Sequence, residues 1–222
     1  MWYTVMSLII FNKRKEVSVL VKSKILSKPF CMAVLICAFI YGLALPFFWG
    51  NDPTSEVGTL SVLCSERKAW FWLWGLLVSG GVFINSQYMF RKFGIKSKLC
   101  TVLGVLSMVC VAVVALTLGH SIEDWNPKRI AHWVSTGIFI ALTVASIAFY
   151  FIINRKKHKC FKGLAIGVFA ILSTFFILFI LIGKGAVMEM VPIALLQIYL
   201  FVINFTSVIK AEPIAEKTTA DM

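Results

Sequence analysis

The sequence predicts an all-α integral membrane protein, a bundle of six transmembrane helices. Its composition, six long apolar runs and the placement of its basic residues all point to this fold. Of the 222 residues, 59% are hydrophobic and only 14% are charged, whereas about a quarter of a typical soluble chain is charged. Between the apolar runs, no stretch is long enough to form a soluble domain.

Each apolar run is close to the length that a helix needs to cross the hydrocarbon core, about 20 residues. A spanning segment must be helical, because lipid offers the backbone no hydrogen-bond partners. The predicted spans are 31–49, 69–90, 99–119, 130–153, 164–183 and 187–209. They divide the chain into a basic N-terminal segment (1–30), a transmembrane domain (31–209) and a C-terminal tail (210–222).

The net charge of +12 is distributed unevenly between the two sides of these spans. Both terminal segments and the second and fourth loops carry 17 of the 22 Lys and Arg residues, and the other side carries five. Cytoplasmic loops carry an excess of Lys and Arg, so we expect both termini in the cytoplasm and the chain in the cell membrane. Because the basic residues form short clusters between apolar runs, no nucleic-acid partner is predicted.

The predicted spans contain no Asp, Lys or Arg, and their only acid or imidazole groups are His132 and Glu189. Ion pumps and proton-coupled carriers need charge at membrane depth, and paired broken helices are also missing. A transporter is therefore the least favoured class. Among the neutral polar residues, Asn85, Gln87 and Asn204 lie near the cytoplasmic ends of their spans and could meet as hydrogen-bond partners.

Small residues at close-packing spacing indicate that helices approach one another closely. Gly163 and Gly167 form a Gly-x-x-x-Gly pair in the fifth span. In membranes such pairs let helix backbones come together, within one bundle or between two copies. Packing within the bundle is favoured, and the formation of a homo-oligomer stays open.

The outer face carries the candidate functional residues. The principal ones are Ser55, Glu56, His132 and Glu189, and weaker ones are Asp52, His120, Glu123 and Asp124. Histidines and carboxylates can ligate zinc, and a carboxylate, His and Ser set can run hydrolysis; solvated loop charge is the alternative. No His-Glu-x-x-His, Gly-x-Ser-x-Gly or Cys-x-x-Cys pattern occurs, so no catalytic set, metal or cofactor is predicted. Only Cys64 of the six cysteines is predicted to face outside, so no disulfide framework is expected.

His132 and Glu189 both fall within about one helical turn of the outer start of their spans. Burying either side chain without a partner is costly. We therefore expect them to contact each other, or Glu56, Asp52 or Ser55 from the first loop. The alternative is that His132 extends to the membrane interface.

Several features together resemble the bacterial and archaeal six-span membrane family catalogued as domain of unknown function 998. They are the six spans, Ser55-Glu56-Val57-Gly58, the entry Arg129-Ile130-Ala131-His132-Trp133 and Asn204 in the last span. More distantly, the chain is similar to the DRAM-type six-span proteins, which also carry a His at the start of a middle span. The resemblance covers residues 30–210; it implies a membrane fold and marks Ser55, Glu56 and His132, but implies no reaction.

The favoured function is the binding of a lipid, a small apolar ligand or a membrane partner at the outer face. Its support is an uncharged interior beneath a polar outer rim. The alternative is a membrane-embedded hydrolase or transferase that acts on lipid headgroups, with His132 and nearby carboxylates as its reactive groups.

Overall fold

The computed structural model describes residues 26–48, 59–118, 126–182 and 185–209. These residues form helices and no strand, which confirms the predicted all-α class. The elements are α2 (Lys28–Ala44), η1 (Leu45–Phe47), α3 (Leu60–Leu63), α4 (Lys68–Lys92), α5 (Lys98–Leu116), α6 (Pro127–Ile153), α7 (Phe161–Ile182) and α8 (Ala186–Phe205).

Five helices in the described residues are long and apolar enough to cross a membrane. They are α2 with η1, α4, α5, α6 and α7. In α8 the apolar stretch is shorter, Glu189–Phe205. The chain is therefore a multi-pass membrane protein with an all-α bundle.

The starts of α5 and α6 follow from local sequence. Asn126 precedes α6, its side chain accepts a hydrogen bond from the Arg129 backbone N–H at 2.9 Å, and Pro127 occupies the first turn. Ser97 caps α5 in the same way through the Cys100 N–H. Such caps satisfy N–H groups that have no partner inside the helix.

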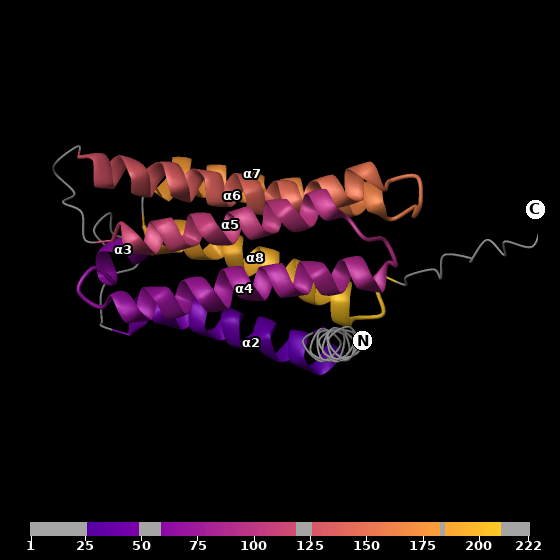
Figure 1. The fold of residues 1–222 in the computed structure, drawn as a ribbon, viewed down its shortest axis with the longest axis horizontal. Helices are drawn as coiled ribbons and strands as arrows, with labels where there is room; N and C mark the ends of the chain where they lie inside the picture. Colours follow the sequence, from indigo (N-terminus) through magenta and orange to yellow (C-terminus); the bar gives the residue numbers. More distant parts are fainter. Residues whose placement is uncertain (1–25, 49–58, 119–125, 183–184, 210–222) are drawn as a thin grey trace, which may run out of the picture.

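The helices run side by side along the long axis of the molecule (Figure 1). Each long helix packs against the next one in sequence, and α8 closes the ring by packing on α7, α2 and α4. The short helix α3 lies at one end, near the first residues of α4, α6 and α8. We call this the α3 end, and the other the far end.

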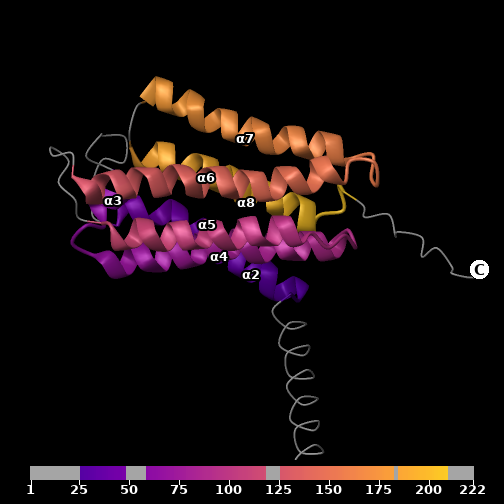
Figure 2. The ribbon, with the colours of Figure 1, turned by 45° about the horizontal axis from the view of Figure 1, so that its top comes forward.

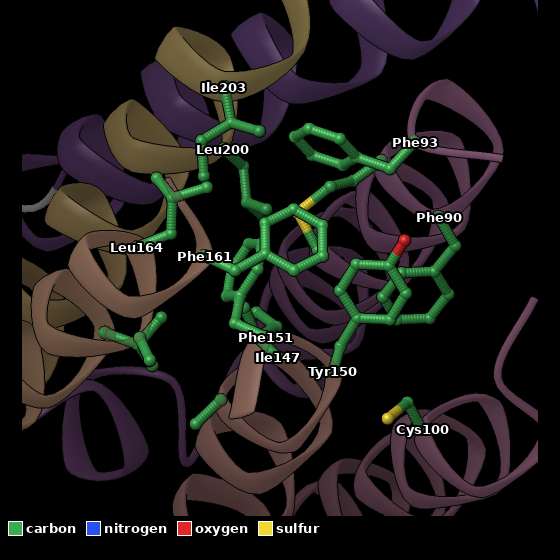
Figure 3. Close-up of a cluster of buried hydrophobic side chains, with 14 of the residues drawn as sticks. Phe90, Phe93, Cys100, Ile147, Tyr150, Phe151, Phe161, Leu164, Leu200 and Ile203 are labelled. Atoms are coloured by element: carbon green, nitrogen blue, oxygen red, sulfur yellow. The ribbon is translucent and has the colours of Figure 1, made fainter. Parts of the chain in front are cut away.

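At the far end, buried aromatic rings from three helices form the centre of the core (Figure 3). Phe90 of α4 stacks on Tyr150 of α6, with ring centroids 4.2 Å apart. Phe161 of α7 meets Phe93 and Phe151 edge to face, at 4.9 and 5.2 Å. Such pairs contribute beyond the area they bury, so this end holds α4, α6 and α7 together tightly.

A polar clamp adds to the far end. The Asn204 Nδ2 donates to the Asn85 carbonyl at 2.9 Å, and the Asn85 Nδ2 donates to the carbonyls of Cys31 at 3.1 Å and Gly81 at 2.9 Å. The Lys92 Nζ donates to the Ile203 carbonyl near the end of α8. The clamp joins α2, α4 and α8, and confirms that Asn85 and Asn204 meet.

Gln87 does not take part in this clamp. Its Oε1 accepts a hydrogen bond from the Thr101 Oγ1 of α5 at 3.1 Å. Gln87 follows Asn85 by two residues, so its side chain lies on roughly the opposite face of α4. The two amides therefore contact different helices.

Helix α7 packs against the bundle only near the far end. Its buried residues are Phe161, Leu164, Ala165 and Val168. Beyond Val168, the described side chains of α7 are half-buried or exposed, up to 80% exposed at Ile180. Figure 2 shows the ribbon of α7 diverging from α6 towards the α3 end.

Gly167 lets α7 and α8 approach closely. A Cβ on Gly167 would lie 2.9 Å from Cε2 of Tyr199, whereas a Cβ on Gly163 would meet nothing within 4 Å. The Tyr199 hydroxyl donates to the Leu164 carbonyl at 2.5 Å, which holds the ring in place. Within the described structure, only one member of the predicted Gly-x-x-x-Gly pair is therefore used for packing.

Gly167→Val should lower the thermal stability of the detergent-solubilised protein, because the ring of Tyr199 cannot move without losing its hydrogen bond. Overpacking of this kind costs about 1–3 kcal/mol. Gly163→Val makes the same chemical change on the same helix and is the control. Equal melting temperatures for the two variants would contradict this account of the packing.

Candidate functional site

Glu189 holds the short helix α3 in place. It lies in the first turn of α8, and its Oε2 accepts a hydrogen bond from the Leu60 backbone N–H at 3.0 Å. The side chain of Thr59, the residue before α3, makes no capping hydrogen bond. The Glu189 carboxylate therefore satisfies a free N–H at the positive end of α3.

This contact closes the α3 end of the bundle. Leu60, the first residue of α3, and Cys64, which directly follows α3, are 1% and 0% exposed. They pack in one apolar cluster with Leu45 of η1, Trp74 of α4 and Met190 of α8. We call the segment from Thr59 to Cys64 the α3 cap, because its buried residues share one cluster with η1, α4 and α8.

His132 joins α6 to the end of α5. It is 7% exposed, and its Nδ1 lies 3.1 Å from the Thr117 Oγ1 and 3.2 Å from the Val114 carbonyl oxygen. The Thr117 hydroxyl itself donates to the Val113 or Val114 carbonyl, so Nδ1 is the donor towards these oxygens. His132 is thus buried at a helix contact rather than extended to the interface.

The other candidates from the sequence, Ser55, Glu56, Asp52, His120, Glu123 and Asp124, lie outside the described residues. Their part in a site stays a prediction. Within the described residues, the hydrogen bonds of His132 lead to α5, that of Glu189 leads to α3, and none joins these two side chains. In the same part of the chain, no three His, Cys, Asp or Glu side chains are grouped to hold a metal ion.

A small cavity lies between α2, α4 and α8, next to the α3 cap. Its volume is about 10 Å³, close to that of one water molecule. The lining is Phe39, Gly42, Leu43, Trp74, Met190, Ile193, Ala194 and Gln197. All of these are apolar except Gln197 and the indole N–H of Trp74. No sequence pattern points to this cavity, because its walls come from three helices far apart in the chain.

A second small cavity, between α4, α5 and α6, is lined by hydroxyl groups. Its volume is also about 10 Å³, and five Ser or Thr residues border it: Ser79, Ser86, Ser107, Thr143 and Ser146. Each hydroxyl donates to a carbonyl of its own helix. Their polar groups are therefore satisfied locally, as expected of small residues that let membrane helices pack closely.

No protein-family model, curated protein or solved structure matches this chain. The resemblance to the six-span family named above therefore stays a prediction, and the candidate site stands on its geometry alone.

Glu189→Ala should release the α3 cap and expose Cys64 to a water-soluble maleimide. Hydrogen bonds to charged groups contribute about 1.5–3 kcal/mol, so in a chain whose only cysteine is Cys64 the labelling rate should rise roughly tenfold or more. Glu66→Ala, at an exposed glutamate two residues from Cys64, is the control. Unchanged labelling in Glu189→Ala would show that the carboxylate does not hold the cap.

Proposed function

We propose that this protein spans the cell membrane six times, with both termini in the cytoplasm, and holds a lipid at the α3 end of its bundle. Six spans require that α8 also crosses the membrane. In support, α8 is apolar and completes the ring against α7, α2 and α4. The sidedness rests on the basic residues, which gather at the far end and in both terminal segments. The α3 end then faces outside.

The observation that carries the lipid proposal is the divergence of α7. The stripe that packs against the bundle begins with Phe161, Leu164 and Val168 and continues along the same face to Ile171 and Phe175. Its first members are buried and its later members only half-buried. This face of α7 is thus packed against the aromatic core at the far end and becomes less buried towards the α3 end.

An acyl chain of an outer-leaflet lipid would pack against this half-buried face of α7. The α7 face is apolar, and lipid tails are as apolar as the side chains that would otherwise cover it. The exposed Lys128, at the outer start of α6, would attract an anionic headgroup. A chain that lies along α7 from the outer leaflet would stop at Val168, the first buried residue of this face.

The hydrolase or transferase alternative needs reactive groups brought together at the α3 end. Among the described residues, His132 and Glu189 each bind backbone groups of other elements, and no observation favours catalysis over structure. A transporter needs a polar path, and the hydroxyl-lined cavity is about the size of one water molecule.

The topology can be tested by cysteine labelling in a cysteine-free background. Lys184→Cys should react with an impermeant reagent added to intact cells, because it follows the fifth span on the outer side. Lys157→Cys and Lys217→Cys should react only after permeabilisation. Labelling of positions 184 and 217 from the same side would mean that α8 does not span, and labelling of position 157 from outside would reverse the orientation.

The lipid proposal predicts that the purified protein retains a phospholipid in native mass spectrometry. Phe175→Ala should lower the lipid occupancy several-fold, because Phe175 lies on the half-buried face of α7 that would contact the lipid. Phe176→Ala removes the same ring from the face that is 56% exposed and should leave occupancy unchanged. A dimer without lipid would instead assign this face of α7 to a second copy, and equal lipid occupancy in both variants would contradict the site.

A further inference from the structure

Aromatic contacts lock two turns together at the far end of the bundle (Figure 1). One turn joins α4 to α5, and the other joins α6 to α7. The ring of His158, from the second turn, lies 5.4 Å from that of Phe93, which directly follows α4, and 4.8 Å from that of Phe161, the first residue of α7. His158 is only 6% exposed. Because both turns contribute a ring to one buried cluster, their exposed side chains belong to a single surface.

That surface carries six exposed cations and no acidic side chain. We call it the basic surface, and its residues are Lys96, Lys98, Arg155, Lys156, Lys157 and Lys159. The described residues include only two acidic side chains, Glu66 and Glu189, and both belong to the α3 end. Neither terminal segment supplies the missing charge, since residues 1–25 hold five basic and one acidic residue and residues 210–222 hold two basic and three acidic ones. The balancing anion must therefore be another molecule.

The turn between α6 and α7 holds its cations in a fixed arrangement. The buried Asn154 donates from its Nδ2 to the Tyr150 carbonyl at 2.8 Å. The Lys157 N–H donates to the Asn154 carbonyl at 2.8 Å, and the Phe161 N–H donates to the His158 carbonyl at 3.1 Å. Like charges repel one another, and these bonds keep the turn closed against that repulsion. A surface that is already ordered loses little freedom when it binds an anion.

The side chains next to the basic surface select the class of anion. Val102 in the second turn of α5, Ile153 at the end of α6 and Ile166 in the second turn of α7 are 54%, 61% and 60% exposed. In a membrane these apolar side chains contact acyl chains. A molecule that meets both kinds of neighbour has a negative headgroup and apolar tails, whereas a free phosphate or a nucleic acid meets only the cations.

We propose that the basic surface binds the headgroup of an anionic phospholipid, with cations from both turns contacting its phosphate. Clusters of Lys and Arg directly beside membrane helices attract anionic lipids, and an Arg such as Arg155 can bind two phosphate oxygens at once. Basic residues on separate loops would satisfy the positive-inside rule equally well. The contact of His158 with Phe93 goes further, because it gathers the cations of two loops at one place.

This inference rests on the membrane placement of the bundle, but neither on its sidedness nor on the lipid at α7. The basic surface lies at the far end, and the half-buried face of α7 lies towards the α3 end. Phe175→Ala should therefore leave binding at the basic surface unchanged, so that the two lipid sites can fail separately.

The test is a titration of the full-length, delipidated Phe175→Ala protein in mild detergent, with bound lipid counted by native mass spectrometry. The two probes are phosphatidylglycerol and phosphatidylcholine with the same acyl chains. Phosphatidylglycerol should bind at least tenfold more tightly. Adding Lys98→Gln and Arg155→Gln, one cation from each side of the surface, should weaken phosphatidylglycerol binding roughly tenfold or more and leave phosphatidylcholine binding unchanged.

Two controls separate the site from net charge and from misfolding. Arg67→Gln with Lys68→Gln removes two exposed cations from the α3 end and should leave phosphatidylglycerol binding unchanged. Lys98→Arg with Arg155→Lys keeps both charges and should bind as the parent protein does.

Equal affinity for the two lipids would overturn the proposal, and so would an equal loss in the two glutamine variants. Glycerophosphoglycerol, the headgroup without tails, should not displace the lipid at the same concentration. If it does, the surface binds free phosphate esters instead. Displacement of the lipid by a single-stranded oligonucleotide at lower concentration would assign the surface to nucleic acid.

Discussion

The hydrogen bonds between Asn85 and Asn204 are the interaction on which the rest of this structure depends. In a membrane the hydrophobic effect does not drive helices together, so packing and interhelical hydrogen bonds must. These two buried amides set the position of α8 along α4, and the Cys31 carbonyl brings in α2. Because α8 is one helix, fixing Asn204 also fixes Glu189, 15 residues or about 22 Å away. The placement of Glu189 on α3 and of Gln197 in its cavity follows from this register.

The same constraint divides the molecule into a tightly packed far end and a more open α3 end. At the far end, the amide clamp and the aromatic rings around Phe161 bury side chains from α4, α6, α7 and α8. Towards the α3 end, α8 stays with α2 and α4 under the α3 cap, while α7 leaves the bundle after Val168. The proposed lipid site lies on the face of α7 in this less tightly packed half.

The sequence alone predicts the long helices and suggests one contact between them. Hydropathy and length locate helices because a backbone in lipid must satisfy its own hydrogen bonds. Asn85, Gln87 and Asn204 could meet because all three lie near the cytoplasmic ends of their spans, and of these Asn85 and Asn204 do. The contact of Glu189 with α3 was not foreseen, since nothing in the sequence links positions 60 and 189. The divergence of α7 was not predicted either, because an apolar helix face has the same composition whether it packs against protein or against lipid. The outer-loop residues Ser55 and Glu56 remain predictions.

The central claim is that α7 is fixed at the far end and open at the α3 end, where a lipid enters. Spin labels on α5 and α7 test it directly, with pairs at exposed positions of the same two helices: Leu99 with Lys162 at the far end, and Leu116 with Ile180 at the α3 end. The account predicts a narrow far-end distance distribution that lipid does not change, and a broader α3-end distribution that narrows when lipid is added. Equally narrow distributions for both pairs, with no response to lipid, would contradict it.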